Sequence, residues 1–293
     1  MKMVFHAPVG DGRQKNISRF IRRAARMILC CSLAVLLTAT LVGARKAMLQ
    51  VHFIDVGCAD AILIKLPYGR NMLIDAGGRR TSRPLAAYLR AHGVRTIERA
   101  IVTHPHANHF GGFFRIIEDF EVREMILAAE RGTDPEYAKL VRRIRARGIV
   151  IRCLRNTSLT ETLAQPGLHL TMQSIRRPHF TVNDRAVTTR LQYGKTGFLF
   201  LSDVGPKVQN IIIGHLKSPQ TIRCVQIPHH GGKISARLAE TFRGAVFVIS
   251  TGKNPYGLPL TATLHRLHGT VWRTDRDGTL VLASDGESIT VKK

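Results

Sequence analysis

Three histidines lie close together in the segment IVTHPHANHFGG, residues 101–112. An apolar run that reads as a buried strand leads directly into a loop with His104, His106 and His109, and two glycines close the loop. At this spacing we expect the three imidazoles to converge on a tight, non-helical loop. Neutral imidazole nitrogens are ligands of zinc and iron. The segment therefore predicts a metal site.

The ends of two further predicted strands also have residues that can bind a metal ion. His229 and His230 follow an apolar run in IPHHGG, and Asp203 ends the run LFLSD. With the first loop, these positions offer enough ligands for one divalent ion and for a second. Asp55 and Asp75 also end apolar runs, and we expect them to support the site by orienting ligands or loops.

The elements that must position these residues are short apolar runs bounded by Gly, Asp and Asn. Strands are predicted at 48–57, 61–67, 71–78, 99–104, 148–154, 168–173, 186–194, 197–203, 221–228 and 244–251. Helices are predicted at 83–93, 134–148, 205–216 and 233–242. The tail, 270–293, reads as an antiparallel meander with turns at Asp277-Gly278 and Asp285-Gly286. Two strand-rich halves joined by helices predict an α/β sandwich of two sheets covered by helices.

An apolar segment precedes this body. Residues 27–44, MILCCSLAVLLTATLVGA, are uncharged, follow seven bases and end in small residues. This pattern is typical of a secretory signal peptide, and its length also suits an uncleaved signal anchor helix. We therefore predict a leader at 1–46 and one domain at 47–293. The protein would be exported to the periplasm or the extracellular space, or anchored in the membrane through 27–44.

The charge divides between these two parts. The chain has 44 bases and 20 acids, of which nine bases and one acid lie in residues 1–46, so the body keeps a net charge of +16. A basic body favours a polyanionic substrate, because Lys and Arg bind phosphates regardless of sequence. Arg79, Arg80 and Lys233 flank the candidate site and are predicted to bind substrate. The 44% hydrophobic content excludes disorder, and five cysteines exclude a disulfide scaffold.

The order of these motifs resembles the metallo-β-lactamase superfamily, and within it the hydrolase domain of ComEC-type DNA-uptake proteins. The matching stretches are VHFIDVGCADAILIKLP, LIDAGG, THPHANHFGG, NDRAVTTRLQYGKTGFLFLSD, VQIPHHGG, VISTGKNPYG and RTDRDG. The resemblance implies a four-layer αβ/βα sandwich with a metal site, usually dinuclear, at one edge. It implies that His104 and His106 hold one ion, His109 the second, and Asp203 bridges them. His229 or His230 would complete the second site, and Asn183 would support it.

The chain departs from the family at positions near the chemistry. The family loop reads HxHxDH, whereas Asn108 replaces the acid here. An amide is an uncharged ligand and cannot act as a base. Ala186 and Gly232 replace serines of the family, and Cys58-Ala59 replaces Gln-Gly. The catalytic candidates are therefore Asp203 and, in the position of the acid, Asn108.

These observations predict a metal-dependent hydrolase with one or two divalent ions, zinc first, with manganese and iron as alternatives. The favoured reaction is hydrolysis of phosphodiesters by a metal-activated water, with DNA as the polyanion. One alternative is a superfamily hydrolase of a small ester, lactam or thioester. Another is a non-catalytic module that binds nucleic acid or a membrane surface, which Asn108 suggests. No protein partner can be inferred, and the sequence contains no multi-helix channel region.

Overall fold

The computed structural model describes residues 3, 48–129, 132, 134–163 and 167–292. The predicted leader, apart from Met3, lies outside these residues, and so does the apolar segment 27–44. Residues Ala47–Lys293 form one compact unit. Within the described part, no helix combines the length and apolar character needed to cross a membrane.

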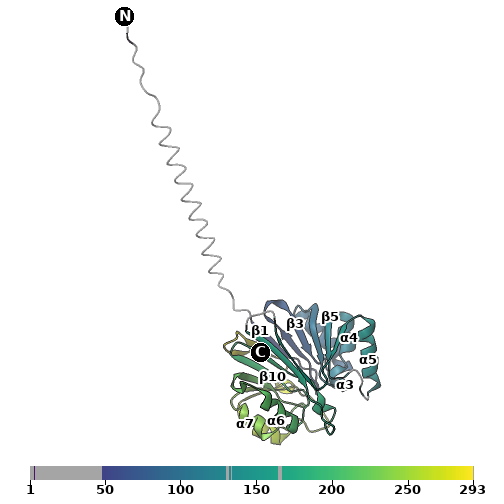
Figure 1. Cartoon of the computed structure of the whole chain (residues 1–293), viewed down its shortest axis with the longest axis vertical. Helices are drawn as coiled ribbons and strands as arrows, with labels where there is room; N and C mark the ends of the chain where they lie inside the picture. Colours follow the sequence, from purple (N-terminus) through teal and green to yellow (C-terminus); the bar gives the residue numbers. More distant parts are fainter. Residues whose placement is uncertain (1–2, 4–47, 130–131, 133, 164–166, 293) are drawn as a thin grey trace. The chain divides into compact units, whose positions relative to one another are not determined.

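Two sheets form the centre of the domain (Figure 1). The first, in the order β15-β14-β1-β2-β3-β4-β5-β6, contains β1 (Leu49–Phe53), β2 (Ile62–Lys65), β3 (Asn71–Ile74), β4 (Thr96–Val102), β5 (Glu121–Leu127), β6 (Val150–Cys153), β14 (Leu280–Ser284) and β15 (Ile289–Lys292). The second, in the order β13-β12-β11-β10-β9-β8-β7, contains β7 (Thr157–Thr162), β8 (Leu168–Ser174), β9 (Thr188–Tyr193), β10 (Thr196–Phe200), β11 (Ile222–Gln226), β12 (Val246–Ile249) and β13 (Thr270–Arg273). Each sheet has a parallel half, β3 to β6 and β10 to β13.

Helices connect and cover the strands. The described α-helices are α2 (Ser82–Ala91), α3 (Ala107–Phe110), α4 (Phe113–Asp119), α5 (Pro135–Ala146), α6 (Pro206–His215), α7 (Ala236–Thr241), α8 (Thr261–Arg266) and α9 (Thr274–Asp277). Short 3-10 turns are η1 (Pro67–Gly69), η2 (Arg79–Thr81), η3 (Asn183–Arg185) and η4 (Pro219–Thr221). The helix predicted at 134–148 is confirmed as α5, where the Asp134 carboxylate accepts a hydrogen bond from the Glu136 amide at 2.8 Å.

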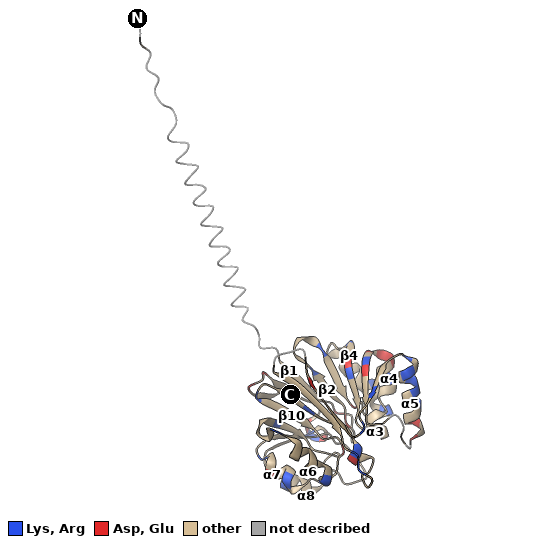
Figure 2. Ribbon diagram, viewed as in Figure 1, with Lys and Arg blue, Asp and Glu red and all other residues tan. Residues whose placement is uncertain are grey.

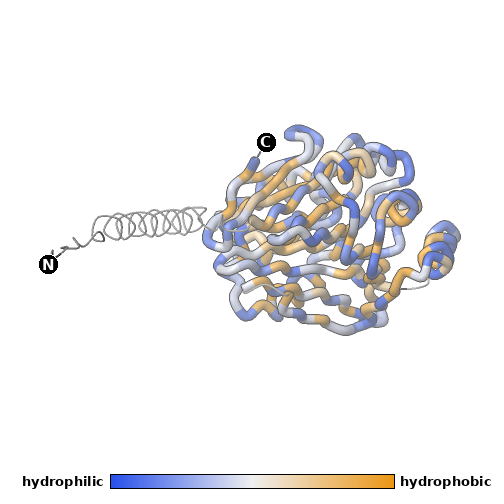
Figure 3. The backbone as a smooth tube through the Cα atoms, turned by 90° about the horizontal axis from the view of Figure 1, so that it is seen from above, coloured by the Kyte–Doolittle hydropathy of each residue, from blue (hydrophilic) through white to orange (hydrophobic). Residues whose placement is uncertain are grey.

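Three apolar layers hold the sandwich together. One lies between the sheets, where Phe53 of β1 packs near Phe200 of β10 with ring centroids 6.0 Å apart. A second joins the first sheet to α2, α4 and α5, and a third joins the second sheet to α6 and α7. Figure 3 shows the apolar strands, in orange, gathered inside the domain, with polar segments toward its outside. The predicted αβ/βα sandwich is thus confirmed.

The C-terminal tail corrects one prediction. A continuous antiparallel meander was expected, but β13 pairs parallel to β12 in the second sheet. The turn of helix α9 then carries the chain across to the first sheet, where β14 lies antiparallel to β1. The hairpin at Asp285-Gly286 forms as expected, between β14 and β15. The prediction failed because turn residues mark where a strand ends and do not say which sheet the next strand joins.

Candidate metal centre

The histidine loop begins where β4 ends. His104 follows the strand and is completely buried, whereas His106 is the N-cap of α3. The carbonyl of His106 accepts hydrogen bonds from the amides of His109, at 2.9 Å, and Phe110, at 3.1 Å. His109 therefore lies in a helical turn, which corrects the expectation of a wholly non-helical loop. Residues three apart lie on one face of a helical turn, so the turn directs His109 to the side of His106.

Asp203 reaches the same edge from the end of β10. The Gln226 side chain of β11 accepts hydrogen bonds from the amides of Leu201, at 2.9 Å, and Ser202, at 2.8 Å. Ser202 in turn donates its hydroxyl to the Thr103 hydroxyl at 2.8 Å, which ties the two sheets together. Asp203 is held in place by this buried network and is only 3% exposed.

Backbone strain is concentrated here. Six described non-glycine residues have a positive φ, and four of them lie at this edge: Asp75, Ser202, His229 and His230. Such conformations cost about 1–3 kcal/mol each and persist where the surroundings enforce them. Their clustering is typical of a functional site.

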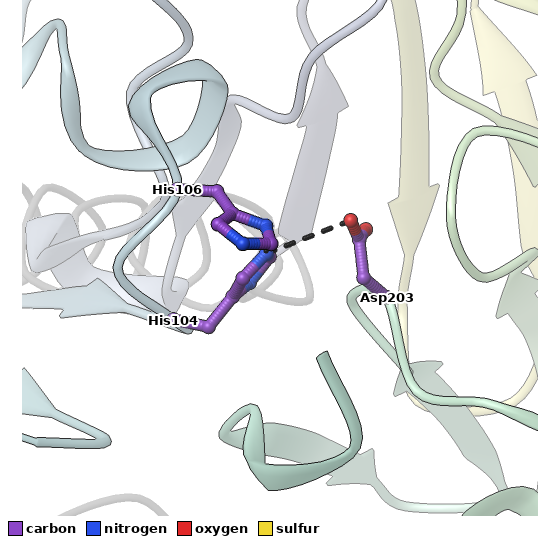
Figure 4. Close-up of side chains that lie close together, drawn as sticks. All are labelled: His104, His106 and Asp203. Atoms are coloured by element: carbon purple, nitrogen blue, oxygen red, sulfur yellow. Dashed lines mark hydrogen bonds and ion pairs between the residues drawn. The ribbon is translucent and has the colours of Figure 1, made fainter. Parts of the chain in front are cut away.

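The oxygen Oδ2 of Asp203 faces imidazoles from different strand ends. It lies 3.4 Å from Nε2 of His109, 3.6 Å from Nε2 of His104 and 3.8 Å from Nε2 of His229. Figure 4 shows the rings of His104 and His106 facing the Asp203 carboxylate. Two ligands of a tetrahedral zinc ion are roughly 3.3 Å apart, given bond lengths of ~2.0–2.1 Å. The distances from Asp203 Oδ2 to these nitrogens are thus long for hydrogen bonds and close to the distance between two ligands of one metal ion.

The donor set fits a divalent ion. Nε2 of His109 and Oδ1 of Asp203 are buried and, among the described residues, have no hydrogen-bond partner. Two groups of ligand atoms could each hold an ion: His104, His106 and Asp203 in one, and His109, Asp203 and His230 in the other. Buried polar atoms without partners are costly, and a cation between them would satisfy both.

Asp75 orients His109 from behind. Its Oδ2 lies 2.7 Å from Nδ1 of His109, and its carboxylate also accepts from the amide and hydroxyl of Thr103. If Nδ1–H of His109 donates to the Asp75 carboxylate, Nε2 is left as the metal-binding nitrogen. Asp75 thus lies where the sequence analysis expected a supporting residue.

Burial and charge set the protonation of the cluster. Burial lowers the pKa of His104 well below its usual value, which favours the neutral form that a metal requires. Burial opposes the charged forms of Asp203 and His109. The imidazoles nevertheless hold the pKa of Asp203 well below its usual range. The Asp203 and Asp75 carboxylates raise the pKa of His109 well above the usual value of histidine. Burial also raises the pKa of Asp75.

The family model of the metallo-beta-lactamase superfamily matches residues 55–171, which include the histidine loop and Asp75. Over these residues the chain is similar to the metallo-β-lactamase superfamily. It is also 21% identical to ComE operon protein 3 of Bacillus subtilis (strain 168), over 79% of this chain and 32% of that protein. The chain therefore spans about a third of the length of this relative.

Two solved structures are among those similar to this chain. One is a diphosphatase from the PhnP family, with 13% identity and a TM-score of 0.47 over 78% of this chain and 94% of that one. Another is described as a putative metallo-beta-lactamase from Thermotoga maritima, with 14% identity and a TM-score of 0.39 over 58% of this chain and 86% of that one.

The structure places the neighbouring histidines His229 and His230 differently. His230 is buried, and its Nδ1 lies 3.0 Å from the carbonyl oxygen of Ser250, to which it can donate. Its Nε2 is then an unprotonated nitrogen that can accept a hydrogen bond or ligate an ion, and the ring stacks on that of His109. The His229 side chain is 49% exposed and lies at the mouth of the site. The geometry favours His230 as a ligand and His229 as a group that meets solvent or substrate.

Asn108 occupies the position at which the superfamily's loop has an acid. Its Nδ2 lies 3.0 Å from Nε2 of His230, so the amide donates to the nitrogen that a second ion would use. The Asn108 side chain also approaches the carbonyl of Cys58 at 3.5 Å. Asn108 therefore satisfies His230 by a hydrogen bond and adds no negative charge to the site.

A further buried acid, Asp60, escaped the sequence analysis. Its Oδ2 accepts from the Gln226 side chain at 2.9 Å and lies 3.9 Å from Nδ1 of His109. Gln226 thus links Asp60 to the turn that carries Asp203. An acid in the apolar stretch VGCADAILI was the available signal, because a carboxylate buried between two strands needs a partner.

Of the other predicted supporting residues, Asp55 has a different role, and the role of Asn183 stays a prediction. Asp55 is exposed, and its Oδ1 accepts from the Gly57 amide at 3.1 Å, so it stabilises a turn and orients no histidine. This corrects its predicted role, because the strand ends at Phe53 and leaves Asp55 in the loop. Asn183 begins η3, and its buried Oδ1 has no hydrogen-bond partner among the described residues.

Two clefts adjoin the cluster, and the predicted basic residues line them. A cleft of about 450 Å³ contains Asn108, Arg79 and Arg80, and one of about 430 Å³ contains Asp203, His229 and Lys233. All three basic residues are exposed, but Arg79 pairs with Glu136 at 2.8 Å, and this ion pair partly neutralises its charge. Figure 2 shows further Lys and Arg segments on the covering helices.

Proposed function

We propose that this superfamily hydrolase cleaves phosphodiester bonds of a polyanion such as DNA, outside the cytoplasm. The observation that carries the metal-dependent reaction is the Asp203 carboxylate, which shares one group of possible ligand atoms with His104 and His106 and a second group with His109 and His230. The likeness of the motifs to ComEC-type hydrolase domains and the +16 body support the choice of substrate.

The chain's own residues have distinct roles in this proposal. His104, His106, His109, Asp203 and His230 would hold the ion or ions. A bound divalent ion acidifies a water molecule to a pKa of about 7 and polarises the scissile bond. Because an amide cannot accept a proton, we assign to Asp203, whose Oδ1 has no hydrogen-bond partner among the described residues, the orientation of the attacking water.

Substrate contacts are assigned to the clefts. Arg80 and Lys233 are exposed in clefts on the two sides of the cluster, where each can meet a phosphate on one side of the scissile bond. Exposed His229 lies beside Lys233 and can meet the same group. Export rests on segment 27–44, and sequencing the N-terminus of the mature protein in fractionated cells tests it. A full-length chain confined to the cytoplasm contradicts export.

The test is cleavage of single- and double-stranded DNA by the purified full chain with Zn²⁺ or Mn²⁺. We expect cleavage by the wild type and a loss of at least about 10²-fold in His104→Ala, because the variant loses an ion ligand. His265→Ala, on exposed α8, is the matched control and keeps the wild-type rate. Equal cleavage by His104→Ala, or none by the wild type, refutes the proposal.

One observation favours a second function. The hydrogen bond from Asn108 to His230 satisfies a ligand nitrogen without any ion, as expected in a module that binds nucleic acid and does not cleave it. Such a module would show steeply salt-dependent DNA binding with no turnover at any metal concentration. Turnover of a chromogenic ester whose rate does not depend on salt would instead indicate a small-molecule hydrolase.

A further inference from the structure

A polar cleft lies on the outer face of the second sheet, apart from the metal centre. The register places Thr160 of β7, Thr171 of β8, Arg190 of β9 and Leu199 of β10 in one row across four strands. The apolar layer under α6 and α7 includes Leu199 and, among the described residues, none from β7, β8 or β9. Helices α6 and α7 therefore pack on β10 and β11, whereas this apolar layer does not extend over β7, β8 and β9.

The cleft over this row has a volume of about 410 Å³ and a lining rich in neutral donors. Ser158, Thr160, Thr171 and Thr188 contribute hydroxyl groups, and Lys217 adds a second cation at the end of α6. No Asp or Glu is among its described lining residues. A lining with hydroxyl donors and cations, and without acids that would repel an anion, is expected of a site that binds an oxyanion.

Arg190 is the unusual member. Its side chain is half-buried, its Nε is buried without a hydrogen-bond partner, and among the described residues it makes no ion pair. Burial lowers its pKa, and no acid opposes that effect. By contrast, Arg99, on the first sheet, pairs with Glu124 at 2.7 Å and Glu161 at 2.8 Å. A half-buried cation without a counter-charge costs free energy, and a bound anion removes that cost.

The guanidinium is also held in one orientation. Its Nη2 donates to Oε1 of Gln192 at 3.0 Å, and the same oxygen accepts from the Thr221 hydroxyl at 2.8 Å. The amide of Gln192 donates in turn to the carbonyl of Gly194 at 2.9 Å. Because neutral groups position Arg190, its charge remains available to a ligand.

We propose that this cleft binds a phosphate group, with Arg190 as the charged anchor and the threonine and serine hydroxyls as neutral donors. A tetrahedral phosphate presents more acceptor oxygens than a planar carboxylate, which suits donors spread over β7, β8 and β9. Lys217 offsets the partial negative charge of the α6 C-terminus beside the cleft. The phosphate can be free inorganic phosphate or part of a nucleic-acid backbone.

The test compares Arg190→Gln with Arg223→Gln in the full chain. Arg223 is an exposed arginine of β11, so its variant removes the same charge away from the cleft. Calorimetry with inorganic phosphate at matched ionic strength should show affinity reduced about tenfold or more in Arg190→Gln and unchanged in Arg223→Gln. Any phosphate bound at the metal centre is common to both variants and cancels in the comparison.

Stability without phosphate gives a second readout. Because Arg190 is uncompensated, Arg190→Gln should unfold at the wild-type temperature or above, and phosphate should raise that temperature less than in the wild type. Equal phosphate binding by the two variants refutes the site. Unfolding of Arg190→Gln at a lower temperature also refutes it, because the arginine would then be a structural group.

The source of the phosphate is decided with an oligonucleotide that lacks a terminal phosphate. If the cleft takes a nucleic-acid backbone, Arg190→Gln weakens oligonucleotide binding and lowers its salt slope by about one. If the cleft takes free phosphate only, Arg190→Gln binds the oligonucleotide as the wild type does but binds inorganic phosphate more weakly. His104→Ala should leave phosphate binding at the cleft intact, so the cleft and the hydrolase proposal can fail separately.

Discussion

At the scale of single residues, Asn108 affects the charge of the candidate metal centre. An acid at this position would bring a negative oxygen toward His109 and His230, whereas the amide donates to Nε2 of His230 at 3.0 Å. The group of His104, His106 and Asp203 needs no contribution from Asn108. We therefore expect the two candidate ion positions to differ in affinity, with the second the weaker.

We expect the wild type to retain one divalent ion per chain after dialysis, and Asn108→Asp to retain two. The added carboxylate supplies a charged ligand and removes the donor that blocks His230. Elemental analysis of metal per chain measures this, with Asn210→Asp, at an exposed position of α6, as the charge-matched control. Two ions in the wild type, or no gain in Asn108→Asp, would contradict the assignment.

The histidines were predictable as single residues because their type and spacing identify them in the sequence. Asp60 and Gln226 were not, because their role depends on a hydrogen bond between residues 166 positions apart in the chain. Asp55 illustrates the reverse case. Its position after an apolar run suggested that it orients a ligand or a loop of the site. Its carboxylate instead accepts from the Gly57 amide within a turn.

At the scale of elements, close backbone approach positions the histidine loop. Gly112 is the N-cap of α4, and its amide donates to the carbonyl of Gly77 at 3.0 Å. A Cβ on Gly112 would lie 1.9 Å from the carbonyl oxygen of Ala76. The loop with His109 is therefore fixed against the end of β3 by a contact that only glycine permits.

Gly112→Ala should destabilise the fold by about 3 kcal/mol or more and also weaken metal binding, because the backbone must move to relieve the clash. Gly214→Ala in α6 is the matched control. A Cβ there has its nearest neighbour at 3.8 Å, so that variant should be neutral or more stable by up to about 1 kcal/mol. Urea unfolding of both variants measures the difference, and equal stabilities would contradict the packing argument.

Strands and helices followed the apolar pattern closely, since most predicted segments contain an observed element. The exception in the tail arose from sheet membership. Val248 pairs with Trp272 in one sheet, whereas Val51 pairs with Leu282 in the other. Local sequence encodes that these residues are extended. Which sheet each strand joins depends on the side chains of the neighbouring strands against which it packs.

At the scale of the whole molecule, a buried histidine couples stability to pH. His52 is 1% exposed, and its Nδ1 lies 2.7 Å from the Tyr88 hydroxyl. Burial, with the nearby His92 and Lys65, lowers the pKa of His52 from 6.5 to about 4. The unfolded chain therefore binds more protons than the folded chain between these two pH values, so the folded state loses stability as the pH falls through this window.

The full effect of His52 is about 3 kcal/mol, present above pH 6.5 and lost by pH 4. We expect His52→Gln to show a correspondingly weaker loss of stability on acidification. Denaturant unfolding from neutral to acidic pH measures this, and the exposed His265→Gln serves as the control. Parallel pH profiles for the wild type and His52→Gln would contradict it.

The sequence by itself determined the ligand types, the order of the motifs, the sandwich fold and the basic character of the body. These depend on composition and local periodicity, which are properties of the chain. Only the tertiary structure separated His229 from His230, placed Asn108 against Nε2 of His230 and left Arg190 without a counter-charge among the described residues. Each of these depends on which distant residues share one small volume, because hydrogen bonds and burial act through space and not along the sequence.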